Sequence, residues 1–377
     1  MKRVNELNVL FHNRRVGRIK RYKNYLTAFE YDKDWLLDGF SISPFALPLK
    51  QQVFISKQEP FDGVFGAFSD SLPDGWGRLL VDRLLLKHNI NPRELSALDR
   101  LAIVGRSGMG ALTYEPDYHF ETASNDNDLD RLAEECSKIL QTDYAENVDE
   151  LFRLGGSSGG ARPKILTTID NEEWIIKFPS SEDKKDIGRQ EYEYSLCAKT
   201  CGIDMTETKL FSSKICDGYF GTKRFDRIKV DGVEKKLHML SASAILETSH
   251  RVPNLDYDIL MKLTLMLTKE HSEVEQLYRL MCFNVFAHNR DDHSKNFTFI
   301  YDDVARKWSL SPAYDLTYSY SIGGEHATTV HGNGRNPGIK DILEVAKAIG
   351  ISTSKAKSIA NDVQECVGDR LKEWLGK

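Results

Sequence analysis

The sequence has few cysteines, and their spacing does not match common metal or disulfide sites. Six cysteines occur among the 377 residues, without a Cys-x-x-Cys pair and without a histidine at metal-ligand spacing. This scarcity argues against zinc-finger folds and small disulfide-stabilised scaffolds. Cys197 and Cys201 stand one helical turn apart in an apolar segment. We predict that the cysteines are small buried side chains in a reducing compartment.

Long apolar runs and an excess of positive charge are also missing. Charged residues such as Arg279 interrupt the longest apolar stretches, so none can span a bilayer. The basic N-terminal residues Lys2 and Arg3 are not followed by the apolar segment of a signal peptide. We therefore predict a cytoplasmic protein without membrane contact. The formal net charge of −5 is atypical of a protein that binds nucleic acid directly.

The remaining pattern mixes strands and helices, which predicts the α+β class. Residues 8–16 and 26–31 have strand-like composition, and a helix is expected over residues 74–87. The polar run at residues 121–128 is the best linker candidate. Further strands around one helix precede a mainly helical segment, which predicts two lobes. The length suggests two or three domains, which we place at residues 1–124, 125–250 and 251–377.

The strongest chemical pattern lies between a long amphipathic helix and a strand. Arg290 and Asp291 are followed by Asn296 at the spacing of a kinase catalytic loop. In such a loop the carboxylate meets the acceptor hydroxyl and the amide reaches a metal ion. Lys295 between them can face the transferred phosphoryl group. The same residues could instead form a solvated polar loop, because short motifs recur by chance.

A second carboxylate supports the catalytic interpretation. Residues 297–309 are expected to form a hairpin, which would return the chain and could place Asp315 beside Asn296. An aspartate at this point could hold Mg²⁺ between the phosphates of a nucleotide. The alternative for Asp315 is an Asx turn after Pro312.

Lys177 stands near the end of an apolar strand and is the candidate ligand for nucleotide phosphates. Strand alternation places Lys177 on the face of Ile175, opposite Trp174 and Ile176. A desolvated lysine needs a negative partner, and Glu191 on the apolar side of the next helix can supply it. A strand lysine paired with a helix glutamate is the kinase pattern. The alternative is an extended surface lysine and an unrelated surface glutamate.

A glycine-rich loop at residues 155–160 could cradle phosphates. Backbone N–H groups near Ser157 and Gly159 can approach phosphate oxygens, because the glycines carry no side chain. No Gly-Lys-Ser or Gly-Lys-Thr follows, so this is not a Walker A loop. The alternative is a flexible turn.

Two weaker patterns have ordinary structural explanations. Residues 105–110 resemble a phosphate loop only loosely, and we predict a tight turn there. His326 and His331 have metal-binding side chains but lie in a glycine-rich segment, where we expect them to be exposed to solvent.

Taken together, the motifs resemble the HipA family, the serine/threonine kinase toxins of bacterial toxin–antitoxin modules. They appear in the family's order along most of the chain. The motifs are Phe61-Asp62-Gly63-Val64-Phe65, Ser71-Leu72-Pro73-Asp74-Gly75-Trp76-Gly77, Ser157-x-Gly-Gly-Ala161, Ile176-Lys177-Phe178-Pro179, Arg224-Phe225-Asp226-Arg227, Asp291-x-His293-x-Lys295-Asn296 and Tyr314-Asp315. The resemblance implies a two-lobed protein-kinase-like fold with an N-terminal α/β subdomain and a mainly helical C-terminal lobe.

The resemblance also implies a site for ATP. By position, Lys177 would bind the ATP phosphates and Glu191 would orient this lysine. The backbone from Lys223 to Phe225 would meet the adenine. Asp226 would approach the nucleotide from the same segment.

The catalytic and metal-binding residues are implied in the same way. Asp291 would engage the acceptor hydroxyl, and Lys295 would steady the transferred phosphoryl group. Asn296 and Asp315 would hold Mg²⁺. Ser157 matches the position where family members autophosphorylate, in a loop whose modification silences the kinase.

Two residues depart from the family pattern. Ser158 follows Ser157, so either serine is a candidate for autophosphorylation. Asp292 stands where glycine is common, and its carboxylate could face the acceptor in place of Asp291.

The resemblance further implies a protein substrate, with aminoacyl-tRNA synthetases as the family's targets. It implies a HipB-like helix-turn-helix antitoxin as partner, through which contact with DNA is indirect. One alternative is a non-catalytic DNA-associated regulator, because residues 342–363 have the spacing of a helix–turn–helix. We favour two packed C-terminal helices, because a basic recognition face is missing. A small-molecule phosphotransferase is the other alternative, because a catalytic loop recognises only the hydroxyl.

Overall fold

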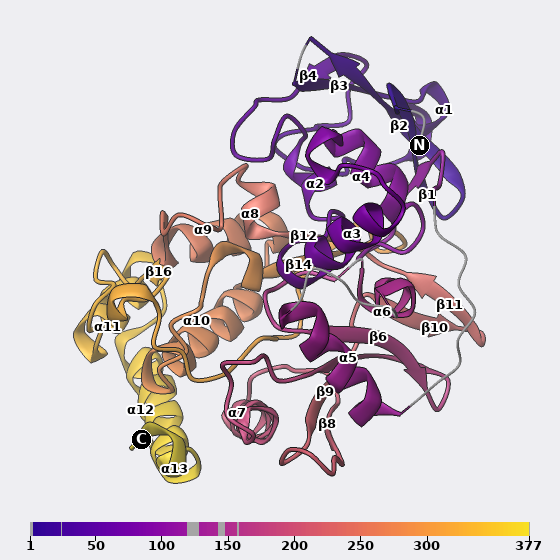
Figure 1. The fold of residues 1–377 in the computed structure, drawn as a ribbon. Helices are drawn as coiled ribbons and strands as arrows, with labels where there is room; N and C mark the ends of the chain where they lie inside the picture. The colour runs from indigo at the N-terminus through magenta and orange to yellow at the C-terminus, as the bar shows by residue number, and fades with distance from the viewer. Residues whose placement is uncertain (1–2, 24, 119–127, 142–147, 157, 377) are drawn as a thin grey trace. The chain divides into compact units, whose positions relative to one another are not determined.

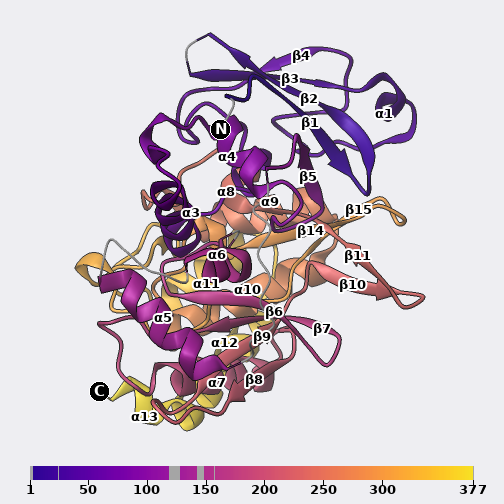
Figure 2. The same ribbon diagram turned by 45° about the vertical axis from the view of Figure 1, so that its right-hand side comes forward.

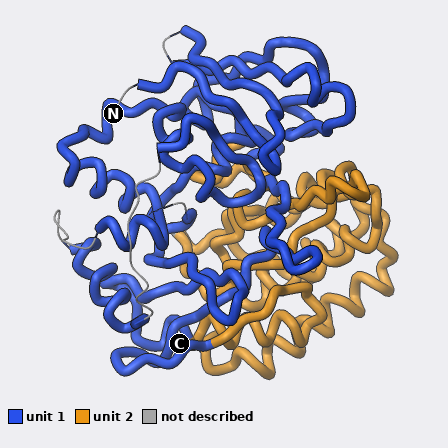
Figure 3. The backbone as a smooth tube through the Cα atoms, turned by 90° about the vertical axis from the view of Figure 1, so that its right-hand side faces the viewer, with its two compact units in different colours: residues 1–188, 210–240, 244–247 blue, residues 189–209, 241–243, 248–377 orange. Residues whose placement is uncertain are grey.

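The structure is a computed structural model that describes residues 3–23, 25–118, 128–141, 148–156 and 158–376 (Figure 1). Contacts within the chain divide it into two compact units, which are coloured separately in Figure 3. Unit 1 comprises Met1–Gly188, Leu210–Leu240 and Ala244–Glu247. Unit 2 comprises Arg189–Lys209, Ser241–Ser243 and Thr248–Lys377. Helices and sheets occur together, so the predicted α+β class is confirmed. The domain boundaries placed at residues 124 and 250 stay predictions.

A five-stranded antiparallel sheet of order β4-β3-β2-β1-β5 begins unit 1. Its strands are β1 (Glu6–Phe11), β2 (Arg14–Tyr22), β3 (Leu26–Tyr31), β4 (Val53–Ile55) and β5 (Leu112–Glu115). The composition of residues 8–16 suggested a single strand, but these residues belong to two strands. His12 and Asn13 have positive φ values of 47° and 63°, and such angles make the tight turn that joins two strands into a hairpin.

Short helices connect the strands of this sheet. They are α1 (Lys33–Asp38), α2 (Gly66–Ser69), α3 (Gly75–Lys87), the 3-10 helix η1 (Pro92–Glu94) and α4 (Ala97–Val104). The helix predicted over residues 74–87 is confirmed as α3. A capping box starts α4, because the Ser96 hydroxyl and the Asp99 carboxylate each accept the other's backbone N–H. The same carboxylate accepts from the N–H of Val4 at 2.8 Å, which fastens α4 to the N-terminal strand.

A four-stranded sheet of order β6-β7-β9-β8 contains the strand predicted to bind the nucleotide. Its strands are β6 (Lys164–Ile169), β7 (Glu172–Lys177), β9 (Tyr219–Lys223) and β8 (Thr208–Phe211). Helices α5 (Leu129–Gln141) and α6 (Val148–Gly155) lie beside this sheet (Figure 2). Trp76 and Leu80 of α3 share one hydrophobic core with α5, α6, β6 and β7. The start of α3 is therefore held close to the glycine-rich loop that follows α6.

Three strands and a short helix follow β9. They are β10 (Arg227–Val230), β11 (Val233–Lys236), β12 (His238–Ser241) and α8 (Ala242–Ile245). β10 and β11 pair as an antiparallel hairpin. The turn between them has Asp231 and Gly232 at positive φ, which is the conformation that tight hairpin turns favour.

Unit 2 is mainly helical. Its helices are α7 (Ile187–Thr200), which begins at the boundary with unit 1, α9 (Tyr257–Thr268), α10 (His271–Phe286), α11 (Ile339–Ala348), α12 (Thr353–Arg370) and α13 (Lys372–Leu375). Helices α11 and α12 pack against each other and against α10, so the C-terminal segment forms packed helices as favoured above. Within the described ranges, no helix combines the length and apolar character that a membrane span requires.

The short strands of unit 2 shape the segment around the predicted catalytic loop. β13 (Leu255–Asp256) pairs in parallel with β16 (Thr328–Thr329). β14 (Thr298–Asp302) and β15 (Lys307–Leu310) form an antiparallel hairpin, which confirms the hairpin predicted over residues 297–309. Two 3-10 helices, η2 (Ser294–Asn296) and η3 (Ile322–Gly324), lie in the connecting loops.

Candidate active site

The candidate catalytic loop starts where α10 ends. Ala287 caps the helix, and His288 has a positive φ of 51°, which turns the chain away from the helix axis. The backbone N–H of Asn289 donates to the Asn284 carbonyl at 2.9 Å, and its side-chain amide donates to Asn284 Oδ1 at 2.9 Å. Both asparagines are buried. The loop therefore leaves the helix at a fixed point.

Asp292 anchors the loop through buried hydrogen bonds. Its carboxylate accepts from the Tyr257 hydroxyl at 2.9 Å and from the N–H of Thr328 at 3.2 Å, and His326 Nδ1 lies 3.0 Å away. The Thr328 hydroxyl donates to the Asp292 carbonyl at 2.5 Å. Burial, reinforced by the Asp292 charge, raises the pKa of Tyr257 well above its ordinary value, so the phenol remains a donor. The loop is thus tied to the start of α9 and to β16.

This network corrects two expectations. The carboxylate of Asp292 was an alternative group for facing the acceptor, but the residue is 1% exposed and both carboxylate oxygens are hydrogen-bonded. It therefore cannot reach a substrate hydroxyl. His326 was expected to be exposed, but it is 4% exposed and lies against Asp292. The two residues are 34 positions apart, so local sequence could not indicate their contact.

Asp291 and Asn296 are brought together in the outer part of the loop. The side-chain amide of Asn296 donates to the Asp291 carbonyl at 2.7 Å, and its backbone N–H donates to the His293 carbonyl at 2.8 Å. The Asp291 side chain is 66% exposed, with one carboxylate oxygen 3.9 Å from His293 Nε2. Because the Asn296 nitrogen is engaged within the loop, its side-chain oxygen is the atom that can ligate a metal ion.

The β14–β15 hairpin returns the chain to this loop. The Tyr314 hydroxyl donates to the Lys295 carbonyl at 2.6 Å and lies 2.6 Å from the Thr298 hydroxyl. The next residue, Asp315, has a left-handed φ of 54°. This conformation costs a non-glycine residue about 1–2 kcal/mol, although aspartate adopts it more readily than most, and such backbone strain is common at functional sites. Tyr314 thus links the backbone beside Asp315 to the backbone beside Asn296.

Lys177 and Glu191 belong to different units. Lys177 is the last residue of β7 in unit 1, and the strand alternates as predicted, with Ile175 and Lys177 on the partly exposed face. Lys177 Nζ lies 5.6 Å from the centre of the Phe220 ring. Glu191 is a buried residue of α7 in unit 2. The pairing of Lys177 with Glu191 stays a prediction.

Lys164 is a candidate phosphate ligand that the sequence did not indicate. It faces Lys177 in the register of β6 against β7, and it is 7% exposed. Its Nζ is next to the glycine-rich loop, 2.6 Å from where a Cβ of Gly160 would stand. Two ammonium groups at directly paired positions beside this loop are suited to binding an anion such as a phosphate. Only the strand register reveals the pair, so no sequence motif could have identified it.

The glycine-rich loop docks on the start of α3. The N–H of Gly160 donates to the Asp74 carboxylate, and the Gly160 carbonyl accepts from the second residue of α3 at 2.8 Å. Gly159 is close to the same carboxylate, since a Cβ there would lie 3.0 Å from Asp74 Oδ1. Ser158 is 2% exposed, and its hydroxyl donates to a carbonyl within the loop. Ser157 lies outside the described residues.

Asp226, predicted to approach the nucleotide, is enclosed by groups of unit 1. Arg224 donates to both carboxylate oxygens, at 2.9 Å and 2.8 Å, Arg227 pairs with the same group, and the N–H of Gly110 donates at 2.8 Å. Burial alone would raise the pKa of the Asp226 carboxyl, but Arg224, Arg227 and the N–H of Gly110 together outweigh burial and hold this pKa below its usual range. The carboxylate is therefore already bound by its own chain. A contact of Asp226 with the nucleotide stays a prediction.

Lys223 and Phe225, whose backbone was predicted to meet the adenine, flank the end of β9. Lys223 faces Trp174 in the register of β9 against β7, and its ammonium group forms an ion pair with Glu172 at 3.0 Å. Because β9 is the neighbour of β7, this segment and Lys177 belong to one sheet. The adenine contact stays a prediction.

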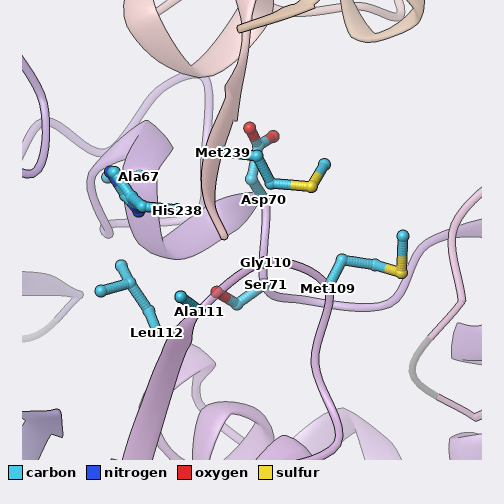
Figure 4. A pocket seen from close by; sticks show the side chains of 9 residues that line it. All are labelled: Ala67, Asp70, Ser71, Met109, Gly110, Ala111, Leu112, His238 and Met239. Atoms are coloured by element: carbon cyan, nitrogen blue, oxygen red, sulfur yellow. The ribbon is translucent and has the colours of Figure 1, made fainter. Parts of the chain in front are cut away.

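Residues 105–110 form a turn, as predicted, and border a small pocket in unit 1 (Figure 4). The pocket is lined by Ala67, Asp70, Ser71, Met109, Gly110, Ala111, Leu112, His238 and Met239. Its volume is about 10 Å³, which holds at most about one water molecule and is far below the roughly 300–1,000 Å³ of most small-molecule sites. His238 is buried there, and its Nε2 lies 2.9 Å from the Ile42 carbonyl. We therefore assign the pocket a structural role.

His238 should make the stability of the protein depend on pH. Burial lowers the pKa of His238 to about 4, so between pH 6.5 and 4 the unfolded chain binds a proton that the folded chain does not. The contribution of His238 to the free energy of unfolding therefore has its full value above pH 6.5. Below pH 6.5 it falls by about 1.4 kcal/mol per pH unit, and by about 3 kcal/mol in all down to pH 4. Urea unfolding between pH 7 and 4.5 measures this slope. We expect His238→Gln to reduce this slope and His88→Gln, at an exposed position, to keep it. An unchanged slope in His238→Gln would show that another group causes the pH dependence.

The sequence matches two described domain families over most of its length. Residues 7–115 match the HipA N-terminal domain, and residues 156–371 match the HipA-like C-terminal domain. Two relatives from Sinorhizobium fredii are named as presumed kinases, Y4dM and Y4mE. Y4dM is 25% identical over 346 residues, which cover 87% of this chain and 81% of Y4dM. Y4mE is 25% identical over 342 residues, which cover 83% of this chain and 77% of Y4mE.

A solved structure shares the fold. It is a chain of the toxin–antitoxin complex of HipA, HipB and operator DNA from Shewanella oneidensis MR-1, with a TM-score of 0.72 and 15% identity over 97% of this chain and 90% of that chain. The predicted two-lobed kinase-like fold, with its N-terminal α/β subdomain and helical C-terminal lobe, is thereby confirmed. With both domain families matched in order, the chain belongs to the HipA family of kinase-like proteins.

Proposed function

We propose that this protein is a Mg-ATP-dependent serine/threonine protein kinase. The observation that carries the proposal is the loop of unit 2 that presents an exposed Asp291 and closes through Asn296. The bond from Tyr314 to Lys295 brings Asp315 back toward this loop. These two side-chain-to-backbone hydrogen bonds join the chain segments that carry Asp291, Lys295, Asn296 and Asp315, which supports a shared role for them.

The proposed reaction depends on positioning and charge. Asp291 accepts the proton of a serine or threonine hydroxyl. At the same time the hydroxyl oxygen bonds to the γ-phosphorus of ATP, and the bond between the γ-phosphorus and the leaving oxygen of ADP breaks. Lys295 faces the transferred phosphoryl group and offsets its negative charge. Asn296 and Asp315 offer an amide and a carboxylate oxygen, which are the hard ligands that Mg²⁺ prefers. Mg²⁺ held by these two residues would supply positive charge to offset the negative charge of the phosphates.

The nucleotide would be held chiefly by unit 1. Lys177 and Lys164, on directly paired positions of β7 and β6, offer two ammonium groups for the phosphates. Backbone N–H groups around Gly159 would cover the same phosphates from the glycine-rich loop. Glu191 would orient Lys177, as in other kinases. The backbone from Lys223 to Phe225 would bind the adenine.

We also propose a protein substrate and an antitoxin partner. The solved relative is a complex of HipA with HipB and operator DNA, which supports a HipB-like partner and only indirect contact with DNA. The family resemblance supports an aminoacyl-tRNA synthetase as the target and autophosphorylation in the glycine-rich loop. Ser157 is the better phosphoacceptor, because the Ser158 hydroxyl is buried and bonded within the loop.

Phosphate incorporation into the protein itself tests this function. The purified protein, first treated with phosphatase, is incubated with Mg-ATP and analysed by intact and peptide mass spectrometry. We expect phosphate on the peptide that contains Ser157 and Ser158. Asp315→Asn should slow incorporation by about 10²-fold or more, because losing charge stabilisation by a metal ion costs several kcal/mol.

The matched control is Asp362→Asn, which changes an exposed aspartate of α12 and should leave the rate unchanged. Equal rates in Asp315→Asn and wild type would contradict the metal-binding role of Asp315. If the wild-type protein neither binds ATP nor transfers phosphate to itself or to an added serine-rich protein, the kinase proposal fails.

A further inference from the structure

We propose that three cysteines of unit 2 form a binding site for one thiophilic d10 metal ion, Zn²⁺ or Cu⁺. Cys197 and Cys201 stand one turn apart on α7, and Cys366 is contributed by α12. The three sulfur atoms all lie within 4.8 Å of one another, and the Cys197 and Cys366 sulfurs are 4.0 Å apart. The proposal does not depend on the kinase function.

The spacing of the three sulfurs is close to that of a metal site. Bonds from Zn²⁺ to thiolate sulfur are about 2.3 Å long, which places two sulfurs of a tetrahedral site about 3.8 Å apart and two sulfurs of a trigonal site about 4.0 Å apart. The Cys197 and Cys366 sulfurs are 4.0 Å apart and no pair is more than 4.8 Å apart, so metal binding requires shifts of no more than about 1 Å. Rotation of the cysteine side chains alone can provide such shifts, since the two helices already touch here.

Contact with Cys197 and burial raise the pKa of the Cys201 thiol, and burial raises the pKa of the Cys366 thiol, so a metal ion must displace the protons when it binds. The guanidinium of Arg279 on α10 donates to the Cys201 carbonyl at 3.0 Å. Arg370 stands four residues after Cys366 on α12. These two positive charges act in the opposite direction and lower the pKa of the nearby thiols, and a bound metal ion deprotonates a thiol that coordinates it. Thiolates select Zn²⁺ and Cu⁺ over Mg²⁺ or Ca²⁺, so this site would not compete with the nucleotide for its metal.

The cluster differs from ordinary buried cysteines. Among the described residues, it is the only group of at least three histidines, cysteines or acidic residues whose ligand atoms converge in this way. Cys197 and Cys201 are 1% and 6% exposed, whereas Cys366 is partly exposed. An ion can therefore enter from the side of Cys366, and a water molecule can complete a tetrahedral Zn²⁺ site there. The prediction that the cysteines are buried side chains did not place Cys366 beside Cys197, because the two are 169 residues apart in the sequence.

A bound ion would join α7 to α12. Helix α7 also carries Glu191, two turns before Cys197. On the proposed kinase function, occupancy of the site would steady the helix that orients the nucleotide-binding lysine. This consequence rests on the proposed function, whereas metal binding itself does not.

Metal binding is tested on the full chain. The protein is reduced with a phosphine and freed of metal, and then titrated anaerobically with Zn²⁺ or Cu⁺ in competition with a chromogenic chelator. Co²⁺ is added separately as a spectroscopic probe, because thiolate ligands give it a charge-transfer absorption in the near ultraviolet. The variants are Cys366→Ala, which changes the partly exposed ligand, and Cys282→Ala, which changes a buried cysteine of α10 outside the cluster.

We expect one ion per chain in the wild type and in Cys282→Ala. Cys366→Ala should bind at least about 10²-fold more weakly, because even residues that only support a metal ligand contribute roughly 10–100-fold to affinity. Tight binding of Zn²⁺ or Cu⁺, together with thiolate charge-transfer absorption of the Co²⁺ complex, supports the proposal. The metal that binds more tightly is then the ion of this site. Equal binding by Cys366→Ala would place the metal elsewhere and overturn the proposal. If the reduced protein binds neither ion while a mild disulfide oxidant joins Cys197 to Cys366, the cluster is a redox pair and the proposal is likewise overturned.

Discussion

Asp291→Asn is expected to lower kcat for phosphoryl transfer by about 10²–10⁴-fold, the usual contribution of a general base. Asparagine keeps the size of the side chain and removes its basicity. The bond that closes the loop goes from Asn296 to the backbone carbonyl of Asp291, so the substitution preserves it. The side chain is largely exposed, and we therefore expect folding and ATP affinity to remain at wild-type values.

Initial rates of phosphate transfer from labelled ATP measure this loss, together with ATP binding by calorimetry. Asp362→Asn again serves as the control for removing an exposed carboxylate. If Asp291→Asn keeps the wild-type kcat, the general base is another group. If ATP affinity falls as much as kcat, the loop acts on nucleotide binding rather than on the acceptor.

Asp292→Ala is expected to reduce the free energy of unfolding by about 3–5 kcal/mol, as for other buried charged partners. The substitution would leave Tyr257, His326 and the N–H of Thr328 without their shared acceptor in a buried place. This loss is a large part of the 5–15 kcal/mol that typically stabilises a domain. Activity should fall with it, because the loop loses its anchor to α9 and β16.

The adjacent residue supplies the control. Asp291→Ala changes an exposed side chain and should alter the free energy of unfolding by no more than about 0.5 kcal/mol. Urea unfolding of both variants at pH 7 measures the difference. We then expect Asp291 to affect mainly the rate of phosphoryl transfer and Asp292 to affect mainly the free energy of unfolding. Equal stabilities of the two variants would contradict the anchoring role of Asp292.

The parts of the fold that depend on local sequence could be predicted. The alternation of β7, the helix α3 and the β14–β15 hairpin each follow from the spacing of apolar and turn residues over fewer than twenty positions. The candidate catalytic loop belongs to this class, because Asp291 and Asn296 are five positions apart and meet through a short turn. The hairpin turn at Asn13 was missed, although asparagine is one of the residues that favour positive φ.

The parts that depend on distant partners could not be predicted. Asp292 and His326 look like solvent-facing residues in a polar loop and in a glycine-rich segment, and only the packing of β16 against β13 brings them together. Lys164 becomes a site candidate only through its register opposite Lys177. For Cys366, the relevant contact crosses 169 residues of sequence. In each case the side chain is ordinary, and tertiary structure alone gives it a charged or reactive neighbour.

The left-handed backbone at Asp315 limits the mutations that evolution can accept there. Glycine and asparagine adopt this conformation at little cost, but neither carries a negative charge. Glutamate keeps the charge but fits the backbone less well and extends the carboxylate by one more carbon. On the proposed function, a substitution at this position therefore costs either the negative charge that would bind the metal ion or local stability. On the proposed function, a homologue with asparagine here would keep its fold and one oxygen ligand but hold Mg²⁺ more weakly, because the negative charge is lost, which gives a kinase a short route to a folded protein of low activity.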